Sequence, residues 1–152
     1  RQKRVFGGTS MFDFLWRAIV IGAAATALLD LWALFLQRAF GIAPPNWAMV
    51  GRWVGHLPRG RFVHEDIGKA EPVPNELAIG WVFHYAVGIA FAVALLAIWG
   101  AGWAKNPTLI PALIVGYVTI GCGWFIMQIR MLNILGHTVF ALGLYGAALL
   151  TR

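Results

Sequence analysis

The feature that most constrains this chain is its long blocks of apolar residues with few charges inside them. Residues 18–36 read AIVIGAAATALLDLWALFL and contain a single charged side chain, that of Asp30. A bilayer has a hydrocarbon core about 30 Å thick, which a helix of roughly 20 apolar residues can cross. In the whole chain 60% of residues are hydrophobic and 12% are charged. A soluble domain is about one quarter charged, so we expect an integral membrane protein.

The apolar blocks predict an all-α fold, because only helices and closed barrels satisfy the backbone inside lipid. We expect an integral membrane bundle of about four transmembrane helices in a single domain over residues 11–152. Residues 1–10, RQKRVFGGTS, are polar and basic and are interpreted as an N-terminal extension. The predicted transmembrane helices occupy residues 14–40, 77–99, 108–128 and 132–150.

The third and fourth predicted helices have almost no turn between them. No Gly, Pro or Asp separates Met127 from Leu132, although two antiparallel helices need a connection of a few residues. We therefore expect that a loop is missing from the sequence between Gln128 and Ile129.

Residues 41–76 form the one long polar segment, and five of the seven prolines lie there. Its apolar side chains recur at spacings of three and four, which predicts a short amphipathic helix at the membrane interface. These side chains are Trp47, Met49, Val50, Trp53, Val54 and Leu57.

The same loop carries a group of basic residues and histidines: His56, Arg59, Arg61 and His64. Arg59 and Arg61 flank Gly60, so their guanidinium groups and nearby backbone amides could converge on one anion. The loop is therefore a candidate site for an anionic lipid headgroup, a phosphate or a partner subunit. The alternative is a solvated loop that only sets the orientation of the chain in the membrane.

The net charge of +6 does not point to nucleic acid, because the basic residues form no patch with aromatic residues between them. They lie in loops and at helix ends, where they contact lipid headgroups and determine topology. With residues 1–10 set aside, the Lys and Arg counts place the 41–76 loop in the cytoplasm and both ends of the chain outside. Including Arg1, Lys3 and Arg4 makes the two sides nearly equal.

Three ionisable residues lie inside the apolar blocks: Asp30, His84 and His137. Such residues are costly in lipid and normally face the bundle interior and find partners there. One interpretation is a structural polar cluster that fixes helix register. Others are a proton or ion relay, a metal site, or two axial ligands of haem b supplied by His84 and His137.

The haem interpretation depends on glycines that would let a porphyrin approach each histidine. Gly80 and Gly88 lie near His84, and Gly136 and Gly143 lie near His137. Glycine is also a common packing residue in membrane helices, so the pattern has an ordinary explanation.

Several blocks together resemble the DUF2938 family of small bacterial membrane proteins of unknown function. The blocks are ATALLDLWALFLQRAFGI (25–42), VGRWVGHLPRGRFVHEDI (50–67), GWVFHYAVGIAFA (80–92), PTLIPALIVG (107–116) and GHTVFALGLYGAALL (136–150). The resemblance implies a multi-pass protein of the bacterial inner (cytoplasmic) membrane that begins near Met11. It also implies a polar, basic loop between the third and fourth helices, and it supplies no assigned activity.

The sequence contains neither a P-loop nor a dinucleotide fingerprint, and Ser10 is its one serine. We therefore expect a non-enzymatic accessory or assembly subunit of a larger membrane complex, in contact with lipids and protein partners. No cofactor is expected. The alternative is a membrane redox protein or a proton- or ion-coupled transport protein that uses Asp30, His84 and His137, with haem b or a metal held by the two histidines.

Overall fold

The computed structural model describes residues 10–127 and 134–151. Within these residues the chain is all-helical and has no β-strand, as the sequence predicts. Short 3-10 turns lie at Leu57–Arg59 and Ala101–Ala104. The α-helices are α1 (Met11–Phe40), α2 (Trp47–His56), α3 (Glu76–Trp99), α4 (Leu109–Met127) and α5 (Ile134–Leu150).

The four long helices lie where the apolar blocks predict them, with ends shifted by at most three residues. Ser10, the last residue of the predicted extension, is the N-cap of α1. Its side chain accepts a hydrogen bond from the backbone N–H of Asp13 and so caps the helix. Residues 1–9 lie outside the described residues, and so does the loop expected between Gln128 and Ile129.

Glycines end two of the helices. Gly41 follows α1 with a φ of +67°, and Gly100 follows α3 with a φ of +84°. This left-handed region is open to glycine at little cost, so both positions stop an apolar helix at a fixed residue.

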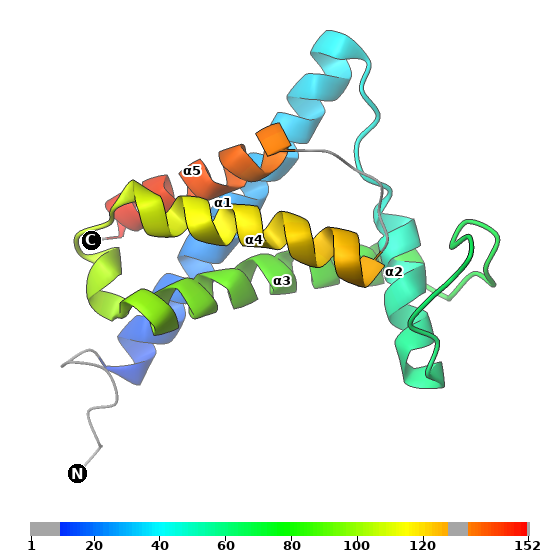
Figure 1. Cartoon of the computed structure of the whole chain (residues 1–152), viewed down its shortest axis with the longest axis horizontal. Helices are drawn as coiled ribbons and strands as arrows, with labels where there is room; N and C mark the ends of the chain where they lie inside the picture. The colour runs from blue at the N-terminus through cyan, green and yellow to red at the C-terminus, as the bar shows by residue number, and fades with distance from the viewer. Residues whose placement is uncertain (1–9, 128–133, 152) are drawn as a thin grey trace.

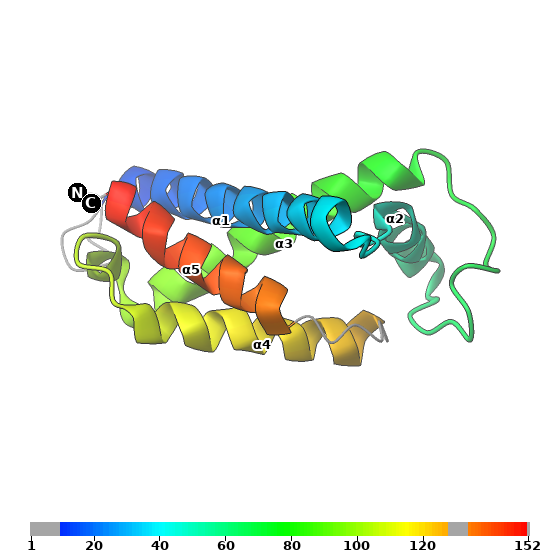
Figure 2. The same ribbon diagram turned by 90° about the horizontal axis from the view of Figure 1, so that it is seen from above.

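The long helices pack in the order α3, α1, α5 and α4, and α3 and α4 also touch near the 3-10 turn that joins them. Figures 1 and 2 show α1 and α5 running in opposite directions. The Arg17 side chain near the start of α1 donates a hydrogen bond to the carbonyl of Thr151, just after α5. This bond joins the first and last helices of the bundle.

Small residues let these helices approach closely. A Cβ placed on Gly22 of α1 would lie 2.5 Å from the Cα of Ile89 on α3. On α5, a Cβ placed on Gly143 would lie 2.9 Å from the Cα of Ala25. The buried core is correspondingly built from small and medium side chains, such as Ala18, Ile21, Ala92, Leu95, Leu144 and Ala148.

The outward faces of the bundle carry large apolar side chains. Val82 is 72% exposed on α3, Ile110 is 70% exposed on α4, and Leu31 is 62% exposed on α1. By length and composition, α1 and α3 are long and apolar enough to cross a membrane. The apolar stretches described in α4 and α5 are shorter.

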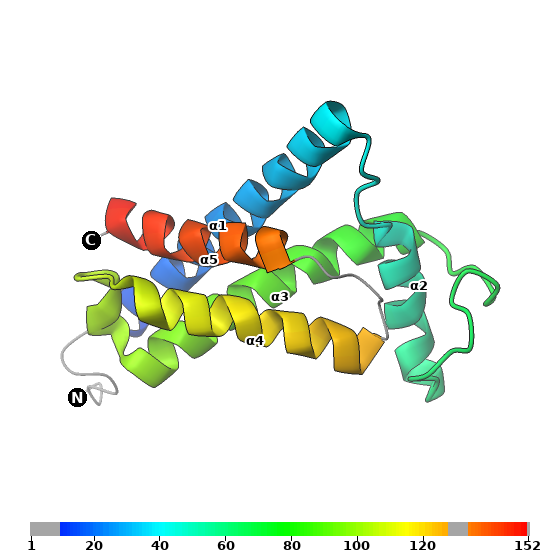
Figure 3. The same cartoon turned by 45° about the horizontal axis from the view of Figure 1, so that its top comes forward.

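Helix α2 lies across the first turns of α3 at one end of the bundle (Figures 1 and 3). The two backbones meet at a pair of glycines: a Cβ on Gly51 would lie 1.7 Å from the carbonyl oxygen of Glu76, and one on Gly80 would lie 1.8 Å from that of Trp47. This direct backbone contact fixes α2 on α3.

The predicted amphipathic helix is confirmed in position, but its surroundings differ from the expected ones. No residue of Trp47–His56 is exposed. Val50 and Trp53 are buried, and the Trp53 ring lies edge-on to Phe83 of α3. The apolar face expected to contact lipid is therefore covered, because the glycine contact brings α3 against it and the loop over residues 57–75 folds onto α2.

Candidate functional site

The structure brings two of the three predicted polar residues together within the apolar helices. Asp30 of α1 faces α3, where His84 Nε2 lies 2.9 Å from Asp30 Oδ1. The Tyr85 hydroxyl donates a hydrogen bond of 3.0 Å to the other carboxylate oxygen. Because a carboxylate accepts, His84 carries a proton on Nε2. Both oxygens of Asp30 therefore have partners from adjacent residues of α3.

An aromatic contact extends this polar group to α2. The ring of Trp47, the first residue of α2, stacks on the His84 imidazole with centroids 3.8 Å apart. Trp81 lies 5.6 Å from Trp47 and 6.0 Å from His84. We call Asp30, His84, Tyr85 and Trp47 the Asp30 cluster; it joins three helices.

His137, the third predicted member, has a different partner. Its Nδ1 lies 2.6 Å from Thr119 Oγ1 on α4, and that hydroxyl is also placed to donate to the Gly116 carbonyl at 2.6 Å. His137 thus pairs α5 with α4, whereas Asp30 and His84 pair α1 with α3. The two histidines therefore lie at different sites.

The described residues do not fit a haem at the positions that the sequence suggested. The side of Gly88 is filled by Thr26 Oγ1, that of Gly80 by the Trp47 carbonyl, and that of Gly143 by Ala25. Gly136 lies outside the residues whose side-chain surroundings are described. These glycines let helices approach one another and leave no gap for a porphyrin.

A metal site does not fit the described geometry either. In the part of the chain that the structure describes, no three His, Cys, Asp or Glu side chains come close enough to hold an ion. The second partner of Asp30 is the hydroxyl of Tyr85, and the second partner of His84 is an aromatic ring.

The 57–75 loop is organised by Arg52, a residue that the sequence did not single out. Its guanidinium makes two hydrogen bonds of 2.8 Å to the Glu76 carboxylate at the start of α3. A third nitrogen donates to the carbonyls of Gly68 and Ala70 at 3.0 and 3.1 Å. The Glu76 hydrogen bond raises the pKa of Arg52 above its ordinary value. Arg52 therefore binds α2, α3 and the loop together.

Asn75 precedes α3, but its side chain makes no capping hydrogen bond to the helix. It adopts a left-handed conformation with a φ of +58°. The carboxylate of Glu76 instead accepts the backbone N–H of Val73 at 3.1 Å, which secures the chain as it enters the helix.

His56 and His64 meet at the end of α2. His56 Nδ1 lies 2.7 Å from His64 Nε2, and His56 Nε2 lies 3.0 Å from the Glu71 carbonyl oxygen. Beside them, the Trp53 indole N–H donates to the Phe62 carbonyl at 2.9 Å. These contacts hold both arms of the loop on α2.

The two arginines of the predicted anion site are exposed on this loop. Arg59 pairs with Glu71 at 3.4 Å, with both side chains more than half exposed. The backbone N–H groups of Gly60 and Arg61 already donate to the Leu57 and His56 carbonyls. An anion would therefore contact guanidinium groups without the backbone amides that the sequence suggested.

The charges of residues 52–76 also balance, with four Lys or Arg and four Asp or Glu. Arg52, Arg59 and Lys69 each have a carboxylate partner. A loop with this balance attracts anions weakly at long range. The motif GRWVGHLPRGRFVHEDI has an evident structural role, because its Gly51, Arg52, Trp53 and two histidines bind α2 to the loop and to α3.

Comparison with known proteins gives one result. No curated protein and no solved structure was found to match the chain. A family model described as a protein of unknown function, DUF2938, matches residues 19–151, which include the Asp30 cluster, α2 and the loop over residues 57–75. The chain therefore belongs to the DUF2938 family.

Proposed function

We propose that this protein is a multi-pass protein of the bacterial inner (cytoplasmic) membrane in which α1, α3, α4 and α5 cross the bilayer. One observation carries the proposal. Helices α1 and α3 have apolar windows of mean hydropathy 2.1, yet only 22% of each window is buried. The core helix of a soluble protein with such a composition is mostly buried. The exposed apolar faces need lipid or another apolar surface around them.

Two measurements test the membrane proposal. The protein should remain in the membrane fraction after alkaline carbonate extraction. Reporter fusions after Gly60 and after Lys105 should show opposite sides of the membrane, with Gly60 cytoplasmic. Extraction into the soluble fraction would refute the membrane location, and fusions on the same side would refute the four-span arrangement.

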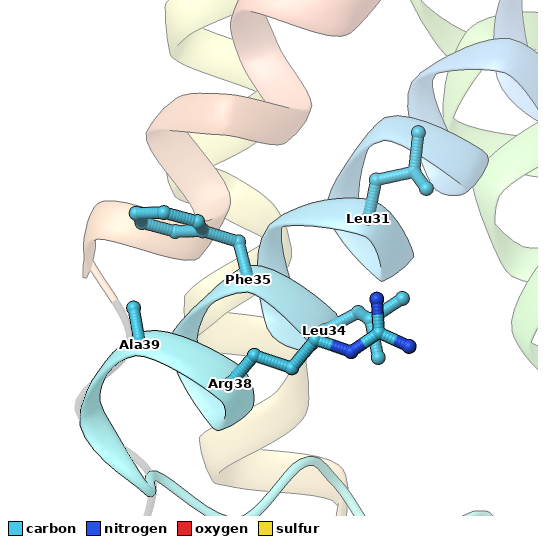
Figure 4. Close-up of a pocket in the computed structure, with 5 residues that line it drawn as sticks. All are labelled: Leu31, Leu34, Phe35, Arg38 and Ala39. Carbon is cyan, nitrogen blue, oxygen red and sulfur yellow. The ribbon is translucent and has the colours of Figure 1, made fainter.

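Within the membrane, the proposed role is that of a non-enzymatic accessory or assembly subunit that packs against another membrane protein. The end of α1 beyond Asp30 supports this role. It extends away from the other long helices (Figures 1 and 3), and Leu31, Leu34 and Phe35 are exposed on it. Figure 4 shows these side chains with Arg38 and Ala39 around a shallow groove on the helix. A partner helix would fill this groove.

Site-specific photocrosslinking tests the subunit role. A photoreactive residue in place of Phe35 should give one discrete protein adduct in intact membranes. The matched control is Val82, an apolar side chain that is 72% exposed on α3, whereas Phe35 is 50% exposed. Lipid adducts alone at both positions, together with recovery of a free monomer from mild detergent, would contradict the proposed role.

The Asp30 cluster favours a second candidate function, proton- or ion-coupled transport. A carboxylate with imidazole and phenol partners inside apolar helices is typical of proton pathways in membrane proteins. Purified protein in liposomes with an internal pH dye should conduct protons under an imposed potential. Asp30→Asn should abolish that flux and Thr119→Ser should preserve it, whereas equal flux in all three proteins would exclude this function.

A further inference from the structure

The pair formed by His56 and His64, which we call the histidine pair, connects the end of α2 to two points of the loop. The His56 side chain is completely buried. Its ring stacks on that of His64 with centroids 4.9 Å apart, and its two nitrogens bond to His64 and to the Glu71 carbonyl. The arrangement of protons in this pair follows from its partners.

A carbonyl oxygen can only accept, so His56 carries its proton on Nε2 and donates to Glu71. In neutral His56 the Nδ1 atom is then an acceptor, and His64 must donate to it from Nε2. Neutral His64 has no proton on Nδ1, and that atom is buried without a hydrogen-bond partner. The closed loop is therefore complementary to the form in which both rings are neutral.

Added protons do not fit this arrangement. A proton on His64 Nδ1 would create a buried N–H group without an acceptor, which is unfavourable. Protons on both rings would place N–H groups on the two facing nitrogens, which are 2.7 Å apart. Burial, and then the charges of His56 and Arg61, lower the pKa of His64.

The other charged groups near the pair do not compensate an added positive charge. On α3, the Glu76 carboxylate interacts electrostatically with His56, and it already holds the guanidinium of Arg52 on α2. On the loop, the Glu71 carboxylate pairs with Arg59. Each of these carboxylates is balanced by an arginine, so neither is free to stabilise an imidazolium.

We propose that the histidine pair makes the 57–75 loop a proton-sensitive element that is closed on α2 when both rings are neutral and released in mild acid. Once the loop opens, both rings reach water and each takes up a proton at its ordinary pKa. Opening is therefore favoured as pH falls below about 6.5. This proposal does not depend on the proposed subunit role.

Hydrogen exchange measured by mass spectrometry on the full chain in detergent micelles tests the proposal. Rates at about pH 7.5 and about pH 5.5, corrected for intrinsic exchange, give the opening constant of loop peptides. With two protons taken up on opening, this constant should rise about a hundredfold. Peptides from the middle of α3 should not change and serve as the internal reference.

Two variants separate the histidine pair from other acid effects. His64→Phe keeps an aromatic ring against His56 but takes up no proton, so the rise should fall to about tenfold. His137→Gln removes a histidine that bonds to Thr119 of α4, away from α2 and the loop, and should keep the full response. A pH-independent loop in the natural protein, or an unchanged rise in His64→Phe, would overturn the proposal.

Nitrogen-15 NMR of the imidazoles in the natural protein decides the matter even if His64→Phe fails to close the loop. Both His56 and His64 should be protonated on Nε2 at neutral pH, and the pKa of His64 should lie below its ordinary value. A proton on Nδ1 of either neutral ring, or a His64 pKa at or above the ordinary value, would refute the proposed arrangement.

Discussion

The substitution Gly51→Ala tests whether direct backbone contact holds α2 on α3. The added Cβ would lie 1.7 Å from the Glu76 carbonyl oxygen, half the 3.4 Å at which ordinary contact begins. It would also lie 2.7 Å from the backbone nitrogen of Gly80. Neither atom belongs to a side chain that can rotate away, so α2 must move off α3 by more than 1 Å, a distance on the order of a bond length.

The expected cost follows from what this movement disrupts. Excess volume in a packed core costs about 1–3 kcal/mol even when side chains can adjust. Here the shift also loosens Val50 and Trp53, and the burial of each side chain contributes roughly 1.5–3 kcal/mol to the free energy of unfolding. The higher helix propensity of alanine offsets about 1 kcal/mol of this loss in stability. The net loss is therefore about 3 kcal/mol, or roughly 6–12 °C in Tm for a chain of this length.

Thermal unfolding in one detergent measures this effect, with the loss of the monodisperse chromatographic peak as the readout. Gly146→Ala is the matched control, because a Cβ there meets nothing within 4 Å in the described structure. That variant should be as stable as the natural protein or slightly more stable. If the Tm decrease in Gly51→Ala is smaller than the Tm difference between Gly146→Ala and the natural protein, the inferred backbone contact is wrong.

Three further predictions concern single interactions. Tyr85→Phe removes one donor to Asp30 and should lower stability by about 1–2 kcal/mol, measured as a Tm decrease that is absent in an Asp30→Ala background, which has no side-chain acceptor. Trp53→Phe removes the bond to the Phe62 carbonyl and should cost about 1 kcal/mol or more; exchange of loop amides should increase while α3 is unchanged. Because burial lowers the pKa of His64, the unfolded chain binds more protons below about pH 6.5. Stability should therefore be constant above that pH and decrease below it, as a Tm series across pH would show.

The long helices could be predicted well because their signals are local. Apolar blocks set their lengths, and glycines at positions 41 and 100 set two of their ends. The position of α2 was also readable from its spacing of apolar residues. Its contact with α3 was not, because the matching glycines at 51 and 80 lie on different helices and either one alone is unremarkable.

The candidate site was predicted only in part for a geometric reason. Counting residues along a helix gives the depth of Asp30, His84 and His137 in the bundle. It does not give the direction in which a side chain points around the helix axis. His137 is an example: it bonds to Thr119 on α4 and not to the Asp30 cluster. The role of Arg52 was missed because its partner Glu76 is 24 residues away.

The bond between Arg17 and Thr151 has a consequence for the order in which the chain can assemble. Its partners lie 134 residues apart in the sequence. The bonds that join α2, the loop and α3 span at most 24 residues. During synthesis the α2–loop–α3 unit can form as soon as residue 99 has been added, long before α5 exists. Helix α1 must wait beside α3 with one face uncovered until nearly the last residue is made, so truncation of α5 would leave that face of α1 without its partner.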